Sequence, residues 1–394
     1  MTRARGRARP RLVHVTTTDM SLDWLLGPQL SAFADAGYDV VGVSAPGPHV
    51  AALEARGIRH IALGSATRSM DPRRDVQALA ELVGVLRRLR PSILHTHNPK
   101  PGLYGRVAGR LTGVPVVVNT VHGLYALPED RVAKRAVVYG LERLASTCSR
   151  AELVQNPEDL ETLARIGVPR SKLVLLGNGI DLDRFDPTRL PVDARRRARA
   201  AMGVEDHEVV VGLVGRLVAE KGYREVFASA RLLRARRPEI RFVVIGPADP
   251  DKADGIGTDE LDAATSDGGV RVLGRRDDVD ALYAGMDLYV LASYREGFPR
   301  SAMEAAAMGL PIVATDIRGC RQVVDDGHSG VLVPPADVVA LTEAVDWLAG
   351  APAVRASMAE SGRARALRHF DQRSVIETTL ATYERLLPLA ASSR

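Results

Sequence analysis

The chain has 394 residues, of which 46% are hydrophobic and 26% are charged, so we expect two or three globular domains and exclude a disordered, collagen-like or coiled-coil architecture. Its two cysteines, Cys148 and Cys320, exclude a disulfide framework and a structural zinc site and favour a reducing compartment. The net charge of +5 is unevenly distributed, since residues 1–180 carry 24 basic and 15 acidic side chains whereas the remainder carries 29 and 33. A basic first half can attract nucleic acid, anionic lipid or phosphorylated substrates, or can be an ordinary solvated surface.

The first eleven residues carry five arginines and are predicted to be an Arg-rich extension, residues 1–11, outside the domains. No uninterrupted apolar stretch follows them, so we expect no signal peptide. No run of about 18 apolar residues occurs in the sequence, so we expect no transmembrane helix. These features favour a cytoplasmic protein.

Short β-branched runs alternate with amphipathic segments along the chain, which favours βαβ units and parallel sheets. In the first half, strands are predicted at 12–17, 39–44, 58–63, 93–97, 114–120, 152–155 and 173–176, and helices at 23–36, 73–89, 102–111 and 131–145. In the second half, strands are predicted at 209–214, 241–245, 270–273, 288–292, 312–315 and 330–333, and helices at about 220–237, 300–308, 337–349, 353–367 and 372–387. We therefore predict two doubly wound α/β domains, residues 12–180 and 192–370, joined by a linker at 181–191, with a ligand cleft between them.

The loop and helix at residues 293–304 carry two glutamates. Glu296 lies in the loop and Glu304 lies about two turns into the helix. Eight helical residues span roughly 12 Å, so the carboxylates are too far apart to share a proton and are better suited to hold two separate hydroxyl groups. The backbone N–H groups between them lie at a helix N-terminus, which favours phosphate. This order suits a nucleotide diphosphate-sugar, although an ordinary helix with one buried, paired glutamate also fits the spacing.

Two cations, Arg216 and Lys221, lie on a predicted strand-to-helix turn. They can neutralise a diphosphate as it leaves a sugar; the alternative is chance placement on the surface. Only five of the 53 basic residues are lysines. Two of them, Lys100 and Lys221, lie in predicted loops, which indicates that these positions need a compact point charge that arginine would not supply. Neither GxGxxG nor GxxxxGK[ST] occurs, which argues against a classical dehydrogenase and a P-loop NTPase.

Three histidines, His95, His97 and His122, lie at the carboxyl ends of two predicted strands of the first domain. Ligands bind at this edge of open α/β sheets, so we expect these histidines and the nearby Lys100 to face a ligand, although a lone histidine is more often structural. No carboxylate completes a recognisable ligand set, so no metal site is predicted.

Taken in order, residues 215–222 and 296–304, with Asn178-Gly-Ile-Asp181 before the linker, resemble the retaining glycosyltransferases of family 4. The resemblance extends from about residue 11 to residue 387. It implies the GT-B fold, with two Rossmann-like domains, an interdomain cleft and a C-terminal helix, residues 371–394, that returns to the first domain. The runs 95–102 and 120–123 resemble the subgroup that builds capsular, exopolysaccharide and O-antigen sugars on lipid carriers.

The resemblance also implies roles for the matching residues. Arg216 and Lys221 would bind the donor diphosphate, and Glu296 would hold the transferred sugar; with His122, near the reacting sugar and acceptor, these form the expected catalytic set. Glu304 would hold the ribose. The other implied donor-binding residues are Arg275, Gly297, Phe298, Pro299, Arg300 and Ser301, and the other implied acceptor-side residues are His97, Lys100 and Asn178.

The implied reaction is a retaining, metal-independent transfer, without a cofactor, from a nucleotide diphosphate-sugar, with UDP favoured over GDP. The implied partner is a polyprenyl diphosphate-linked acceptor, and no nucleic-acid-binding motif is recognised. The predicted helix at 131–145 carries basic residues beside apolar ones, which suits a protein on the inner face of the cell membrane, although an ordinary core-facing helix fits equally well.

Three alternatives remain open: the same chemistry on a small soluble acceptor, a sugar-nucleotide isomerase on a similar scaffold, and a nucleotide-sugar-binding protein without catalysis. The chain also departs from the family after the first strand. Many relatives carry a glycine pair there, whereas residues 16–21 read TTTDMS, so no site residue is assigned to that loop.

Overall fold

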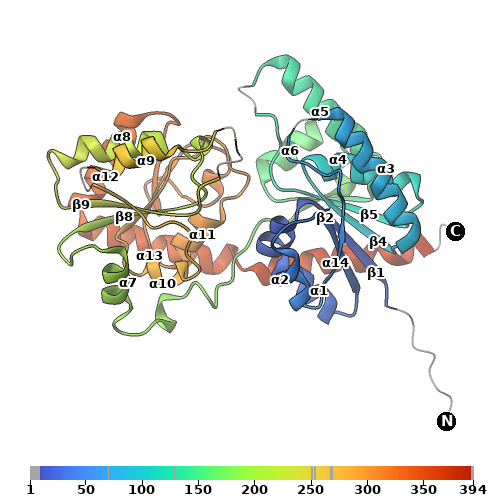
Figure 1. Cartoon of the computed structure of the whole chain (residues 1–394), viewed down its shortest axis with the longest axis horizontal. Helices are drawn as coiled ribbons and strands as arrows, with labels where there is room; N and C mark the ends of the chain where they lie inside the picture. The colour runs from blue at the N-terminus through green and yellow to red at the C-terminus, as the bar shows by residue number, and fades with distance from the viewer. Residues whose placement is uncertain are drawn as a thin grey trace, which may run out of the picture. The chain divides into compact units, whose positions relative to one another are not determined.

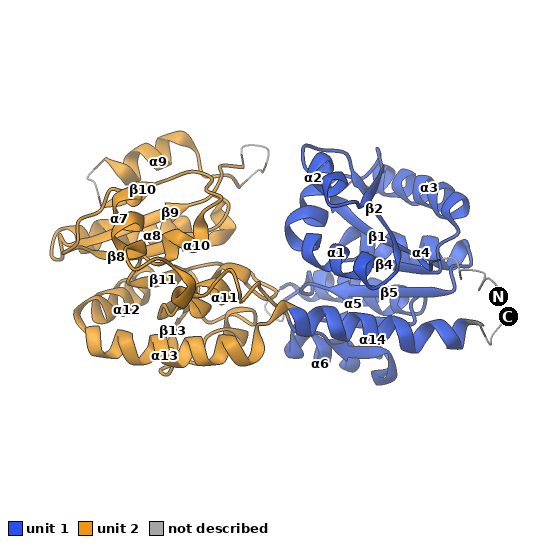
Figure 2. Cartoon of the chain, turned by 90° about the horizontal axis from the view of Figure 1, so that it is seen from below, with its two compact units in different colours: residues 1–177, 373–394 blue, residues 178–372 orange. Residues whose placement is uncertain are grey.

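The computed structural model describes residues 9–69, 71–127, 130–249, 252, 254–266 and 269–391. The chain divides into two compact units, unit 1 with residues 1–177 and 373–394 and unit 2 with residues 178–372 (Figure 2). Each unit is built on one parallel sheet with helices packed on both faces (Figure 1). The predicted two-domain α/β fold is confirmed.

The sheet of unit 1 has the order β3-β2-β1-β4-β5-β6-β7. Its strands are β1 Arg11–Thr18, β2 Asp39–Ala45, β3 Arg59–Ala62, β4 Ile93–His97, β5 Val116–Val121, β6 Ala151–Val154 and β7 Leu173–Leu175. Its helices are η1 Ser21–Leu25, α1 Gly27–Asp35, α2 Val50–Ala55, α3 Pro72–Leu89, α4 Lys100–Leu111, α5 Val132–Ser146, α6 Pro157–Arg165, η2 Arg170–Lys172 and α14 Gln372–Ala391.

Alternate side chains of the unit 1 strands enter two different cores. Leu12 of β1 packs with Phe33 of α1 and Tyr383 of α14 on one face, whereas Val13 packs with Leu82 of α3 on the other. This alternation is the period-two pattern of a strand that is buried on both faces. Helix α14, drawn in red in Figure 1, is thus part of the core of unit 1 although it ends the chain.

The sheet of unit 2 has the order β10-β9-β8-β11-β12-β13. Its strands are β8 Val209–Val214, β9 Ile240–Ile245, β10 Val270–Val272, β11 Leu288–Leu291, β12 Ile312–Thr315 and β13 Gly330–Val333. Its helices are η3 Pro187–Arg189, α7 Ala194–Met202, η4 Ala219–Lys221, α8 Tyr223–Arg234, α9 Thr258–Thr265, α10 Val279–Tyr283, α11 Arg300–Ala307, η5 Cys320–Gln322, α12 Val338–Gly350 and α13 Pro352–His369.

The stretch that the sequence predicts to be a linker, residues 181–191, lies inside unit 2. Phe185 is buried in the same core as Tyr283, and Asp186 pairs with Arg363 at 2.7 Å. These contacts tie the stretch to α10 and α13. The turn residues that suggest a linker therefore describe an irregular but packed segment.

Several short helices escape the sequence analysis, namely α2, α6, α7, α9 and α10. They have nine residues or fewer, too few turns for a clear 3.6-residue period. The helix predicted at 23–36 is wrong in its first part, because the chain forms the π-helix η1 and then starts α1 with Pro28 in its first turn, where proline is well tolerated. None of the described helices is both long and apolar enough to cross a bilayer.

Candidate active site

In unit 2 the loops that follow β8 and β11 are in direct contact. Gly222 has a φ of 72°, and a Cβ there would lie 2.0 Å from the carbonyl oxygen of Ala292, so only glycine fits. The backbone N–H of Tyr294 donates to the carbonyl of Glu220 at 2.9 Å. This close approach brings Lys221, on the first loop, to Glu296, on the second.

Glu296 is held in place by three neighbours. Lys221 Nζ lies 2.5 Å from Glu296 Oε1, and the Ser293 hydroxyl donates to the same oxygen at 2.8 Å. On the loop after β12, a Cβ on Gly319 would lie 2.5 Å from the Glu296 carbonyl oxygen. The predicted cation and carboxylate are therefore an ion pair, and sequence analysis missed the two residues, Ser293 and Gly319, that position it.

The N-terminus of α11 is the second part of this candidate donor site. Pro299 is its N-cap, and within this fully described helix no side chain caps the first turn. The Asn178 side-chain amide donates to the Phe298 carbonyl at 3.0 Å, and the Phe298 ring meets Phe370 edge-on with centroids 5.9 Å apart. Asn178, expected on the acceptor side, thus lies in unit 2 and fixes the loop that leads into α11. Helical N–H groups here favour a phosphate.

Glu304 lies in the second turn of α11, on the side of Tyr283. The Tyr283 hydroxyl is 3.2 Å from Glu304 Oε2 and 3.1 Å from the Ser301 carbonyl. Burial raises the pKa of Glu304, and the charge of Arg300 opposes this rise. A partly buried carboxylate with one fixed hydroxyl partner suits a hydroxyl-bearing ligand group.

Arg216 lies on the same loop after β8 as Lys221, and Arg275 lies on a further loop at the same edge of the sheet, after β10. Arg216 Nη1 lies 2.5 Å from Asp249 Oδ2, so a carboxylate already orients this cation. Arg275 is more exposed, with Nη2 3.4 Å from Asp277 Oδ1. The structure thus joins Lys221 to Glu296 directly, and places Arg216 on the loop of Lys221 and Arg275 on the loop after β10.

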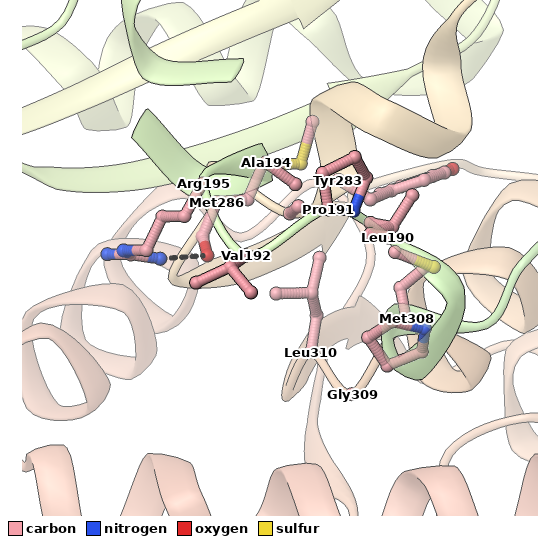
Figure 3. Close-up of a pocket in the computed structure, with 12 residues that line it drawn as sticks. Leu190, Pro191, Val192, Ala194, Arg195, Tyr283, Met286, Met308, Gly309 and Leu310 are labelled. Atoms are coloured by element: carbon pink, nitrogen blue, oxygen red, sulfur yellow. Dashed lines mark hydrogen bonds between the residues drawn. The ribbon is translucent and has the colours of Figure 1, made fainter. Parts of the chain in front are cut away.

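A cavity of about 400 Å³ in unit 2 (Figure 3) is not this site. Most of the residues that line it are of apolar type, with Leu190, Met286 and Leu310 among them. Its arginine, Arg195, donates to the Met286 carbonyl at 3.2 Å, as the dashed line shows, and pairs with Asp287. Neither Lys221 nor Glu296 is among the residues that line it.

In unit 1, histidines and a tyrosine form a hydrogen-bonded chain at the predicted edge of the sheet. His122 Nε2 lies 2.9 Å from His97 Nδ1, His97 Nε2 lies 3.1 Å from His14 Nδ1, and His14 Nε2 lies 3.4 Å from the Tyr383 hydroxyl. Tyr383 belongs to α14, so the last helix of the chain completes a cluster that begins on β1. His14 and Tyr383 are the members that sequence analysis missed.

The chain continues from Tyr383 to the remaining histidine. The Tyr383 hydroxyl also contacts His95 Nδ1, and His95 Nε2 lies 2.7 Å from Thr120 Oγ1. Both ring nitrogens of His14, His95 and His97 therefore have partners. The predicted grouping of His95, His97 and His122 is found, with every link internal to unit 1.

Burial keeps these imidazoles neutral. It lowers the pKa of His14 to about 3 and that of His122 to about 4, where a hydrogen bond with Gln155 opposes the fall. It also lowers the pKa of His95 and of His97 well below the usual value, and the neighbouring histidines add to this effect.

Nitrogens of His14, His95 and His97 lie within 4.8 Å of one another, close enough to hold a cation. A metal ion needs the nitrogen lone pairs to point at one centre. His97, however, stacks on His95 (4.6 Å, 15°) and on His14 (5.3 Å, 24°), so the lone pairs of His97 lie in a plane close to parallel with each of the other two rings. The arrangement fits a hydrogen-bonded chain better than a metal centre.

Lys100 does not take part in this cluster. Its ammonium donates to the carbonyls of Thr67 (2.9 Å) and Ser69 (2.7 Å) and pairs with Asp75 at 2.5 Å. These three partners account for its three protons. We therefore assign Lys100 a structural role, which joins the start of α4 to the start of α3, in place of the expected acceptor-side role.

Two family models match this chain. The one described as "Glycosyltransferase Family 4" matches residues 29–184, and the one described as "Glycosyl transferases group 1" matches residues 208–350. The chain belongs to glycosyltransferase family 4. The family resemblance seen in the sequence is confirmed, and the protein is a glycosyltransferase.

Family 4 relatives cover most of the chain. The capsular polysaccharide biosynthesis glycosyltransferase CapM of Staphylococcus aureus is 24% identical over 385 residues, 96% of this chain and 97% of the relative. The UDP-Gal:alpha-D-GlcNAc-diphosphoundecaprenol alpha-1,3-galactosyltransferase of Escherichia coli is 29% identical over 67% of this chain and 68% of the relative. A D-inositol 3-phosphate glycosyltransferase of Saccharomonospora viridis is 30% identical over 74% and 69%.

Among solved structures, Anabaena Alr3699/HepE in complex with UDP and glucose is similar to this fold. Its TM-score is 0.78 at 18% identity, over 95% of this chain and 100% of the Anabaena chain. The predicted GT-B fold is confirmed.

Proposed function

We propose that the protein is a retaining glycosyltransferase that moves a sugar from a UDP-sugar to a saccharide carried on a polyprenyl diphosphate. The observation that carries the proposal is the Lys221–Glu296 pair with the N-terminus of α11. A cation, a carboxylate and helical N–H groups gather at the carboxyl edge of the unit 2 sheet, where such sheets bind ligands. The name of the E. coli relative supports a lipid-linked acceptor, and the UDP in the Anabaena structure supports the nucleotide.

In the proposed reaction, the bond between sugar C1 and the diphosphate oxygen breaks, and the acceptor hydroxyl oxygen bonds to C1 on the same face. The hydroxyl proton passes to an oxygen of the departing UDP. Lys221, Arg216 and the N–H groups of α11 stabilise the charge that develops on the diphosphate. Glu296 holds hydroxyl groups of the sugar, and Glu304 holds the ribose.

We further propose that the transfer needs no divalent metal. The carboxylate beside each cation is already paired, Asp249 with Arg216 and Glu296 with Lys221, so neither is a ready metal ligand. Activity that persists in EDTA supports this part of the proposal, and activity that returns only with Mg²⁺ or Mn²⁺ contradicts it.

The test is incubation of the purified protein with UDP- and GDP-sugars, each with and without polyprenyl diphosphate-linked saccharides. Released nucleotide is measured by mass spectrometry, and the anomeric configuration of the product by NMR. We expect acceptor-dependent release from a UDP-sugar with retained configuration, which Lys221→Ala and Glu296→Ala abolish. Arg224→Ala is the control, since Arg224 pairs with Glu260 on the surface of α8 and α9 at 2.8 Å and should be dispensable.

The same assay separates the alternatives. The similarity to a D-inositol 3-phosphate glycosyltransferase makes a soluble sugar-phosphate or polyol-phosphate acceptor the second candidate, so inositol 3-phosphate is included as an acceptor. Isomerised donor without any acceptor identifies an isomerase. Donor binding that Lys221→Ala abolishes, with no turnover under any acceptor, identifies a binding protein.

We propose that α5 is the surface by which the enzyme contacts an anionic membrane. Val137, Leu141 and Leu144 form an apolar stripe along this helix, with 62%, 41% and 66% of each residue exposed. The single acidic residue of α5, Glu142, turns towards the buried Arg106, at 2.6 Å. Arg143 of the same helix is also exposed, so α5 combines exposed apolar side chains with a basic one, a pattern that binds anionic lipid surfaces.

Vesicle flotation tests this surface. We expect the wild type to float with phosphatidylglycerol vesicles and not with pure phosphatidylcholine, and Leu144→Asp to reduce flotation by about tenfold. Val76→Asp on α3 is the matched control, since Val76 is also 66% exposed. An equal loss in both variants, or no loss in Leu144→Asp, contradicts the proposal.

A further inference from the structure

The segment after β1 departs from both the expected helix and the family pattern. It forms the five-residue π-helix η1, and π-helical turns are rare and frequently occur at functional sites. Trp24 lies in η1 and is 40% exposed, whereas Leu22 and Asp23 before it are buried. Because η1 directly follows β1, Trp24 lies at the carboxyl edge of the unit 1 sheet, the ligand-binding edge of such sheets.

The side chain of Trp24 is supported by His49, which in turn contacts two buried aspartates. The indole meets the His49 ring nearly at right angles, with centroids 4.7 Å apart. His49 Nδ1 lies 3.1 Å from Asp23 Oδ2, and the His49 backbone N–H donates to Asp19 Oδ2 at 2.7 Å. Asp19 and Asp23 are only 6% and 7% exposed. The ring orientation is thus fixed in advance, which lowers the entropy cost of binding a ligand.

The loop that carries His49 is also tightly packed. A Cβ on Gly47 would lie 2.5 Å from both carboxylate oxygens of Asp19, and Arg56 lies 3.5 Å from Asp23 Oδ1. Two buried carboxylates, an imidazole and a guanidinium therefore position one exposed indole. A single exposed hydrophobic residue is ordinary on a protein surface, but one with this support is not explained by packing alone.

Polar and aromatic groups continue along the same edge. In the sheet order β2-β1-β4-β5, His49 follows β2, Trp24 follows β1, His97 ends β4 and His122 follows β5. Three strand intervals give this row a length of roughly 14 Å, enough for more than one sugar ring. An indole offers a flat, electron-rich face to the C–H groups of a pyranose.

We propose that Trp24 is a stacking platform for a pyranose ring of the acceptor, an inference that rests on the proposed function. Trp24 recognises the saccharide and not the lipid or the diphosphate. As a ligand-contacting residue of unit 1, it contributes to acceptor binding and leaves donor binding to unit 2.

Fluorescence tests the contact directly, because the chain has two tryptophans, Trp24 and Trp347. In Trp347→Phe protein the emission reports Trp24 alone. Short-chain prenyl diphosphates that bear a panel of mono- and disaccharides are titrated against the same prenyl diphosphate without sugar. We expect a saturable change in emission with at least one sugar-bearing probe and none with the sugar-free probe. Equal changes with both, or no change with any probe, overturn the inference.

Kinetics provide the second readout, with the acceptor that the wild type uses. We expect Trp24→Ala to raise the acceptor KM at least tenfold and to change the donor KM and kcat less than twofold, with Trp24→Phe close to wild type. Trp347→Ala is the control and should change neither KM. An unchanged acceptor KM in Trp24→Ala, alongside active wild type, refutes the platform while the proposed function stands. A wild type that transfers no sugar refutes the proposed function, and the fluorescence titration then decides on Trp24 by itself.

Discussion

Replacing Tyr383 with phenylalanine tests whether the hydrogen-bonded chain of unit 1 exists as described. Tyr383 is fully buried, and its hydroxyl joins His95 Nδ1 to His14 Nε2. Its ring contacts with Phe33 and Tyr38, at centroid distances of 5.6 and 5.9 Å, survive the change. The substitution therefore removes one oxygen and leaves two buried imidazole nitrogens without that partner.

The expected cost follows from this geometry. A buried polar group that loses its partner costs about 1–3 kcal/mol. The contact with His95 is short and the contact with His14, at 3.4 Å, is long, so we expect most of the cost from the first. We predict that Tyr383→Phe lowers the free energy of unfolding of unit 1 by about 2–3 kcal/mol.

The two tryptophans allow each unit to be followed alone. Trp24 lies in unit 1 and Trp347 in unit 2, so urea unfolding of Trp347→Phe protein reports unit 1 and that of Trp24→Phe protein reports unit 2. With a urea dependence of about 1–3 kcal/mol per M, the midpoint of unit 1 should fall by about 1 M, and the midpoint of unit 2 should not move.

The matched control is Tyr38→Phe. Tyr38 packs on the same ring and is 8% exposed, and no hydrogen bond of its hydroxyl is described within the part of the chain that the structure covers. It should cost less than about 1 kcal/mol. If Tyr383→Phe costs no more than this control, or shifts both units equally, the reasoning about the chain is wrong.

Three further predictions concern stability. The pKa values of the four cluster histidines are lowered in the folded state, so the unfolded state binds more protons below about pH 6.5. The free energy of unfolding of unit 1, followed by Trp24 emission, should therefore fall by about 1.4 kcal/mol per histidine between neutral pH and about pH 5.5. An equal unfolding midpoint at both pH values would contradict this. Gly222→Ala should destabilise unit 2 by more than about 2 kcal/mol in urea unfolding followed by Trp347 emission. The control is Gly309→Ala, which should cost about 1 kcal/mol, because Gly309 has a φ of 75° and no atom lies within 4 Å of the added Cβ. Equal costs would show that the Ala292 carbonyl is not the obstacle to a side chain at position 222. Arg106→Met should lower the free energy of unfolding of unit 1 by about 3–5 kcal/mol, because it leaves the buried Glu152 carboxylate without the guanidinium that lies 2.8 Å away. Arg170→Met, which breaks an exposed ion pair with Glu161, should lower it by less than about 1 kcal/mol in the same assay.

The local pattern of the sequence was enough to predict the strands of both sheets and the candidate residues on the loops that follow them. Lys221 and Glu296 are 75 positions apart, yet both lie on loops that follow strands of one parallel sheet, so the sequence could place both at its carboxyl edge. The long helices were equally visible, because several turns repeat the same apolar spacing. Helices as short as α10, with five residues, carry no such repeat.

The supporting contacts could not be predicted, since they depend on packing between distant segments. His95 and Tyr383 are 288 positions apart, and no periodicity links a strand of one unit to the last helix of the chain. Gly319 is similar, because its closeness to Glu296 is visible only once two loops are placed together. Lys100 is the opposite case. Its position in the sequence favours contact with a ligand, whereas in the structure its ammonium group contacts three oxygen acceptors of nearby residues.

The position of α14 at the end of the sequence affects the order in which the two units can finish folding during synthesis. Unit 2, residues 178–372, is complete before the last helix emerges, whereas unit 1 still lacks the helix that carries Val375, Tyr383 and Leu386 into its core. At about 5–20 residues per second, synthesis of the intervening unit takes roughly 10–40 s. The half that is made first is therefore the half that finishes folding last, and a nascent chain stalled at the end of α13 exposes to chaperones the part of the apolar core that α14 would cover.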